Sequence, residues 1–159
     1  MTPLQPRIVE LQEKNLIGVS VTMSVTHNLT GQLWGSFMPR RSEITHRANT
    51  DFMSMQIYDE AYFKGFSPTR EFTKWAAVEV SNNTIIPKGM STMTIPSGLY
   101  AVFDYKGMSG NPAIFQYIFS EWLPQSEYQL DHRPHFEVLG EKYKNNDPNS
   151  EEEIWIPIR

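Results

Sequence analysis

The stretch "IFSEWLPQSEY", Ile118 to Tyr128, resembles an earlier stretch of the same chain, "LWGSFMPRRSEI", Leu33 to Ile44. When the two are aligned, Trp122 falls on Phe37, and each is followed by an apolar residue and a proline. After a gap of one residue, a Ser-Glu pair falls on a Ser-Glu pair. The order of the elements around these stretches supports the match, because each half reads as strand, helix, strand, strand. The sequence therefore predicts an internal duplication.

The first repeat, about residues 5–80, alternates between strand and helix patterns. Residues 16–25 are β-branched and apolar, as in a strand. Asn28 or Thr30 can cap the helix that follows, and strands are predicted again at 51–58 and 72–80. The predicted helix carries one apolar stripe and ends at a proline; the stripe is Leu33, Trp34, Phe37 and Met38, and the proline is Pro39.

The second repeat, about residues 92–159, has the same order. A strand is predicted at 98–105, and Asn111-Pro112 has the residue types that open a helix. Strands are predicted at 135–143 and 152–158. The apolar stripe of this helix is Ile114, Phe115, Ile118, Phe119 and Trp122, and its end is Pro124.

The segment 82–98 contains two prolines and two glycines, and we expect it to link the repeats. Neither repeat is long enough to bury two aromatic faces by itself, so we expect a single domain over residues 1–159. The predicted fold class is α+β, with duplicated β-α-β-β halves related by pseudo-twofold symmetry. Antiparallel sheet and two main helices would surround a central ligand groove, because ligand sites favour such junctions.

Composition excludes several classes of function. The net charge of −4 argues against a nucleic-acid surface, which would be basic and clustered. The absence of cysteine excludes disulfides, thiolate metal sites and cysteine catalysis. The N-terminal stretch has no apolar core of a signal peptide and no apolar run is long enough for a membrane helix. We therefore expect a cytoplasmic protein that does not act at a membrane.

Glu137 is the unusual residue, because it lies between Phe136 and Val138 in a predicted buried strand. Burying an unpaired carboxylate costs several kcal/mol or makes it take up a proton. In the alignment of the repeats Glu137 falls on Met53, so the acid has no counterpart in the first half. Side chains alternate along strands, and each of three strands then has a mixed face: Trp75, Ala77 and Glu79; His135, Glu137 and Leu139; Glu153, Trp155 and Pro157. If these faces line the groove, they form a box of rings and acids that suits a flat, lipophilic and cationic molecule.

Three segments carry a family resemblance: "IPSGLYAVFDYKG" (95–107), "EWLPQSEYQLDHRPHFEVLGEKY" (121–143) and "EEEIWIPIR" (151–159). Together they resemble the GyrI-like small-molecule-binding domain, which also provides effector-binding domains of bacterial AraC- and MerR-type transcription regulators. The resemblance implies a duplicated strand-helix-strand-strand fold with a ligand groove. It also implies that the buried acid of the multidrug-sensing relatives falls on Glu137, with Trp122 and Trp155 as ring partners.

The resemblance leaves three functions open. The leading hypothesis is a stand-alone binding domain for a lipophilic small molecule, without direct nucleic-acid binding, since no basic or helix-turn-helix-like segment remains. The second is a hydrolase of cyclopropane-bearing genotoxic products, in which Glu137 acts with a tyrosine such as Tyr100 as proton donor. The third is a protein inhibitor of a gyrase-like partner. The expected ligand-binding residues are Glu137, Trp155, Trp75, Trp122, Phe37, Leu139 and Tyr100.

Structural alternatives accompany these predictions. A tyrosine or a backbone amide could satisfy a buried Glu137, and the tryptophans could belong to the core. Asp131, His132 and His135 do not have the spacing of a common zinc site, so we expect neither a metal nor a cofactor. The acidic run at 146–153 is expected to be a solvated turn in which only Glu153 faces inward. A regulator, gyrase or a second copy of the chain is a possible protein partner.

Overall fold

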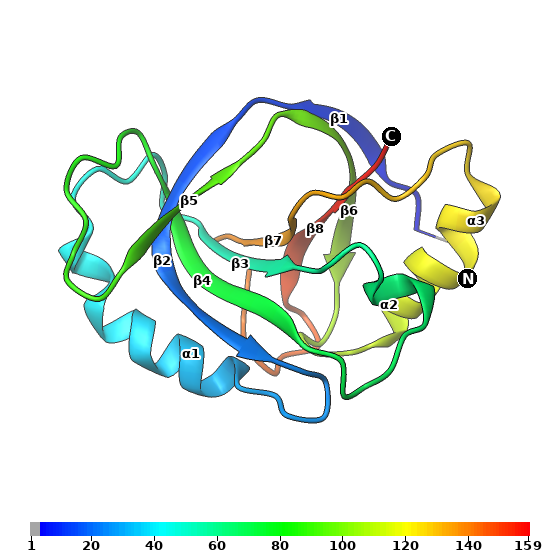
Figure 1. The fold of residues 1–159 in the computed structure, drawn as a ribbon, viewed down its shortest axis with the longest axis horizontal. Helices are drawn as coiled ribbons and strands as arrows, with labels where there is room; N and C mark the ends of the chain where they lie inside the picture. Colours follow the sequence, from blue (N-terminus) through cyan, green and yellow to red (C-terminus); the bar gives the residue numbers. More distant parts are fainter. Residues whose placement is uncertain (1–3) are drawn as a thin grey trace.

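A computed structural model describes residues 4–159, and within them eight strands form one curled antiparallel sheet (Figure 1). The order of strands across the sheet is β1-β6-β8-β7-β3-β4-β2-β5. The central pair, β3 with β7, joins the two halves of the chain. The strands are β1 (Arg7–Leu11), β2 (Lys14–Met23), β3 (Phe52–Ile57), β4 (Phe72–Val80), β5 (Ser91–Ile95), β6 (Gly98–Lys106), β7 (His135–Leu139) and β8 (Glu151–Pro157).

The helices lie in two groups on opposite sides of the central strands (Figure 1). The first group is α1 (Thr30–Phe37), which continues through Pro39 as the 3-10 helix η1 (Met38–Glu43). The second is a continuous run of α2 (Ala113–Tyr117), the π-helical η3 (Ile118–Trp122) and α3 (Leu123–Gln125). A further 3-10 turn, η2 (Tyr62–Lys64), lies between β3 and β4.

Asparagines precede both main helical segments, but the prediction that side chains cap these helices is wrong, because the N-cap residues are Leu29 and Pro112 and, within the part of the chain that the structure describes, neither helix has a side-chain capping bond. The Asn28 side chain accepts a hydrogen bond from the backbone N–H of Thr30 at 2.9 Å, and Asn111 does the same for Ala113 at 3.0 Å. These bonds fix the turn before each helix without capping its first turn directly.

The predicted duplication is present, and each half has one more strand than the sequence indicated. The halves are β1-β2-α1-β3-β4 and β5-β6-α2-β7-β8. The first strand of each half pairs with the other half, because β1 pairs with β6 and β5 with β2. The segment 82–98, which was expected to link the repeats, also contains β5, a strand that the sequence did not predict. Flanking prolines and glycines gave this segment the pattern of a loop. In addition, its partner strand, β2, is distant in the sequence.

The two pairings between the halves, β1 with β6 and β5 with β2, form one continuous ladder. Leu11 pairs with Gly98, and Lys14 pairs with Ile95, three residues on along one strand and three back along the other. The register therefore continues without a slip from β1–β6 into β2–β5. This continuity curls the sheet and leaves short edge strands, which limits unwanted pairing with other chains.

The curled sheet has an inner face and an outer face, each with its own core. The inner cluster is Leu11, Leu16, Met53, Met55, Trp75, Ala77, Ile95, Tyr100, Val102 and Phe136, with Trp155 packed against it. On the outer face, the cluster under α1 includes Leu33, Phe37, Ala76, Val78 and the half-buried Phe52. The cluster under α2 and η3 includes Phe103, Ile114, Ile118, Ile154 and Ile156. The space between the two outer clusters lies over β3 and β7.

Two glycines give opposite predictions for stability. A Cβ on Gly18 in β2 would lie 2.1 Å from the Ala76 carbonyl oxygen and 2.7 Å from the Ala77 Cα, whereas nothing lies within 4 Å of a Cβ on Gly35 in α1. We expect Gly18→Ala to lower the free energy of unfolding by about 2–3 kcal/mol through overpacking. Gly35→Ala should raise it by up to about 1 kcal/mol through helix propensity. Urea unfolding of both variants measures the two shifts; equal shifts would contradict this account of the β2–β4 contact.

Candidate functional site

The candidate site lies on the outer face of the sheet, above the pair β3–β7. Glu137 pairs with Ser54 on one side and with Ile154 on the other. In the next row His135 pairs with Gln56. Paired residues point to the same face of a sheet, so these side chains form a polar floor between the two outer clusters. This floor is the groove floor below.

Glu137 is desolvated, although the residue as a whole is only half-buried. Burial raises the pKa of its carboxyl group, partly offset by the positive charge of Lys74. No donor within residues 4–159 forms a hydrogen bond that stabilises its charge. The predicted alternative, a tyrosine or amide that satisfies the acid, is therefore not seen. An ionised Glu137 lacks the partner that a buried carboxylate requires.

A second acid and one base accompany Glu137. Glu152 in β8 is next to Glu153, which pairs with Val138, and so it lies on the same face as Glu137. Burial first, and then the negative charge of Glu137, raise the pKa of Glu152 to about 8, while Lys74 lowers it. Lys74 itself pairs with Gln56 across β4 and β3. The site thus combines two carboxyl groups with one ammonium group.

Aromatic rings close one end of the groove floor. Phe63 from η2 stacks on Phe119 from η3, with ring centroids 4.9 Å apart, and on His135 at 5.6 Å. Tyr58 packs edge-on against His135 at 4.9 Å. His135 is 5% exposed, and burial lowers its pKa to about 3, so the imidazole is neutral. Tyr58, Phe63 and Phe119 are called the aromatic cap below.

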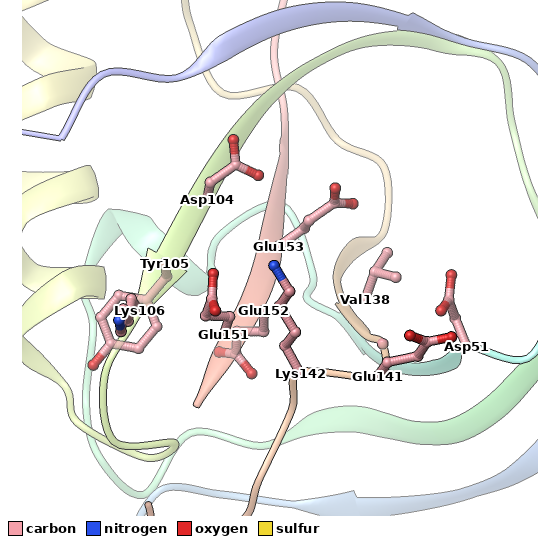
Figure 2. A pocket seen from close by; sticks show the side chains of 11 residues that line it. Asp51, Asp104, Tyr105, Lys106, Val138, Glu141, Lys142, Glu151, Glu152 and Glu153 are labelled. Carbon is pink, nitrogen blue, oxygen red and sulfur yellow. The ribbon is translucent and has the colours of Figure 1, made fainter. Parts of the chain in front are cut away.

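Two cavities flank this region. One, of about 440 Å³, lies at the start of β8 and is strongly acidic (Figure 2). Figure 2 shows the Lys142 side chain among the acidic side chains of this cavity. The acidic residues that line the cavity are Asp51, Asp104, Glu141, Glu151, Glu152 and Glu153. The other, of about 480 Å³, lies beside the aromatic cap and includes Tyr58, Phe63 and His135 in its lining.

The register corrects the predicted grouping of faces. Phe136, and not Glu137, pairs with Trp155, and Met55 pairs with Trp75. Both tryptophans therefore face the inner cluster, on the opposite side of the sheet from Glu137. Alternation within each strand was predicted correctly, but it does not say which face of one strand adjoins which face of the next.

Tyr100 also lies on the inner face. It is fully buried, and its hydroxyl donates a hydrogen bond to the Pro134 carbonyl at 2.7 Å. Burial raises the pKa of this hydroxyl. The expected pairing of Tyr100 with Glu137 as proton donor is therefore wrong, because the sheet separates them.

The remaining predicted residues are divided between groove and core. Leu139 shares the face of Glu137, one position further along β7. Phe37, the last residue of α1, is fully buried and packs on Trp34 and Phe52. Trp122 packs edge-on against Phe103 at 5.2 Å, in the cluster under η3. These two contacts are those of core residues.

Sequence reasoning missed several residues near Glu137. Glu152 was assigned to a solvated turn with only Glu153 facing inward, but Glu152 is the one that shares the face of Glu137. The alternation of side chains along β8, counted back from Ile154, indicates that Glu152 and not Glu153 lies on this face. Phe119 was recognised only as part of a helical stripe, and Tyr58 and Phe63 had no periodic signal because they lie in the short segment between β3 and β4.

Two findings concern other kinds of site. In residues 4–159, no cluster of histidine and acidic side chains has the arrangement of a metal site. No helix in the same part of the chain combines the length and the apolar character needed to cross a bilayer.

The desolvation of Glu137 predicts a stability gain when the acid is removed. We expect Glu137→Met to raise the free energy of unfolding by about 1–3 kcal/mol at pH 8. The gain should be smaller at pH 5, because ionisation destabilises the folded state only as pH rises from the ordinary carboxyl pKa towards the raised one. Urea unfolding at both pH values measures this. Glu121→Met, at an exposed position of η3, is the control and should change little; a gain independent of pH would contradict the argument.

Comparison with known proteins identifies similar chains. Residues 4–159 match the GyrI-like small molecule binding domain. The transcriptional regulator BrlR from Pseudomonas aeruginosa is 31% identical over 157 residues, which are 98% of this chain and 56% of BrlR. The chain thus spans about half the length of this relative.

Two solved structures have the same fold. An integron cassette protein from Vibrio cholerae superposes with a TM-score of 0.68 at 17% identity, over 98% of this chain and 96% of that one. SAV2435, solved bound to tetraphenylphosphonium, superposes with a TM-score of 0.62 at 20% identity, over 98% of this chain and 94% of that one. At these identities the likeness is one of fold.

Proposed function

Because the chain belongs to the family of GyrI-like small molecule binding domains, related to the effector domains of transcription regulators, we propose that it binds a lipophilic cation above the groove floor. Glu137 would be the polar anchor of the ligand. Tyr58, Phe63 and Phe119 would supply the apolar contact area.

One observation carries this proposal: Glu137 is desolvated and has no hydrogen-bond donor of its own within the described chain. Such a group destabilises the fold when ionised, and a bound cation offsets that cost because it supplies the missing charge. A neutral ligand would leave the carboxylate uncompensated. The site therefore favours positive charge over neutral or negative charge of the same shape.

The aromatic cap supports a lipophilic ligand. Rings provide both apolar area and attraction for cations over their faces. Phe63 is 36% exposed and lies in a short turn, so an aromatic ligand that displaces it would exchange one set of ring contacts for another. The ligand of SAV2435, tetraphenylphosphonium, is a cation of this class and a suitable probe.

The hydrolase and inhibitor alternatives receive less support. Hydrolysis was expected to use Tyr100 as proton donor, and that hydroxyl is engaged with Pro134 on the other face. No described surface gives a specific reason to favour gyrase as a partner. A connection to a regulator, as in BrlR, would make this domain the part that senses the ligand.

Calorimetric titration with tetraphenylphosphonium tests the proposal. We expect saturable binding, and Glu137→Gln should weaken it by more than tenfold because the charge is lost while the shape is kept. Tetraphenylborate, an anion of the same shape, should bind the wild type far more weakly. Trp155→Phe, on the inner face, is the control and should keep its affinity.

Two other results would contradict the proposal. Equal affinities for the phosphonium and the borate would remove the role of charge. Loss of binding in Trp155→Phe, with binding kept in Glu137→Gln, would move the ligand to the inner face, where Trp75 and Trp155 were expected to meet it.

A further inference from the structure

Glu152 and Glu137 place two carboxyl groups close together on the outer face of the sheet. The two residues come from neighbouring strands, and their side chains are diagonal neighbours on the outer face, within reach of one another for chains of this length. Two carboxylates at this range repel one another strongly when both are shielded from water. One of them must find a counter-charge or a proton.

Among the described residues, Lys74 from β4 is the cation whose charge acts on both acids of this pair. His135 from β7 is neutral, and the tyrosines around the pair are neutral acids whose pKa values are raised by burial at Tyr58 and Tyr143. The groups near the pair from each neighbouring element are Lys74 (β4), His135 (β7), Tyr58 (after β3), Tyr105 (β6, paired with Glu152), Tyr143 (after β7), and the cavity lysines Lys106 and Lys142 with Glu151 and Glu153 (β8).

We propose that Glu137 and Glu152 share one proton in the empty site, and that a cationic ligand binds in exchange for it. With one proton, the two acids and Lys74 are neutral as a group. A monovalent cation that displaces the proton leaves the group neutral again. Glu152 is thus the second acid of the site, and this assignment rests on the proposed function.

The titration of the pair agrees with this charge balance. Burial and Glu137 together raise the pKa of Glu152 to about 8, and burial raises that of Glu137. At pH 7 the pair is therefore expected to hold a proton. By linkage, proton and ligand compete below about pH 8, so the observed affinity should rise about tenfold per pH unit there and level off above it.

Calorimetry of tetraphenylphosphonium binding measures the exchange directly. Titration at pH 7 in phosphate and in Tris, which differ in ionisation enthalpy, counts the protons released per ligand. We expect about one for the wild type, and a dissociation constant that falls about tenfold from pH 6 to pH 7.

Two variants separate the pair from the general pH response of the protein. Glu152→Gln removes the repulsion and leaves Glu137 with Lys74, so fewer protons should be released at pH 7 than by the wild type, and the affinity should depend less on pH. Glu151→Gln, the preceding residue on the other face, should behave as the wild type. Lys74→Met provides a second approach if Glu152→Gln folds poorly: proton affinity rises without the ammonium charge, so the affinity should level off at a higher pH.

The outcomes distinguish this inference from the function it rests on. Binding that depends on Glu137 but releases no proton, with the same affinity at pH 6 and pH 8, overturns the proton exchange and leaves the binding function intact. An unchanged levelling-off pH in Lys74→Met also overturns it. No binding at any pH overturns both.

Discussion

The pairing of β3 with β7 is the contact on which the groove depends. It joins the two halves, and it sets Ser54 beside Glu137 at the centre of the sheet. The exchange of first strands holds the same two halves together on the other side of the curl, through the ladder from Leu11–Gly98 to Lys14–Ile95. Because each half lends a strand to the other, neither can move away from the groove alone. The floor is therefore a fixed surface, and it keeps Glu137 in its desolvated position.

The inner face provides the stability that such a floor requires. Trp75, Trp155, Phe136 and Tyr100 pack against one another there, with Phe136 stacked on Trp155 at a centroid distance of 5.1 Å. Apolar burial of this kind is the main favourable contribution to folding. The sheet thus has ring packing on one face and, on the other, a desolvated acid without a hydrogen-bond donor among the described residues. Trp75 and Trp155, which were expected to contact the ligand, instead pack in the inner cluster beneath the groove floor.

Much of the architecture could be predicted from the sequence, and the site only in part. β4 at Phe72–Val80 matches its predicted strand, and both helices begin after the expected asparagines. The pairing of strands that are distant in the sequence could not be predicted, because alternation identifies the two faces of a strand but not which face of the next strand adjoins each. For the same reason the alignment of the repeats is one residue out in β3 and β7. Phe52 packs under α1, whereas Phe136, its aligned counterpart, lies in the inner cluster.

The corrected faces keep the asymmetry that made Glu137 conspicuous. The residues of β3 on the outer face are Phe52, Ser54 and Gln56, and none is acidic, whereas the second half contributes both Glu137 and Glu152. Lys74, whose positive charge acts on both acids, comes from the first half. Charge balance at the site is therefore a contact between the halves, made across their central pair of strands.

The aromatic cap and the shared proton answer the same physical requirement. Rings cannot close over an uncompensated negative charge without excluding the water that stabilises it. A proton on the acid pair makes the group beneath Tyr58 and Phe63 neutral, so the cap can pack against His135 at little cost. A lipophilic cation brings its own rings and its own charge, and it can therefore replace both the cap contacts and the proton. A ligand with only one of these features would replace only one of them, which is why the site should discriminate by charge and by aromatic surface together.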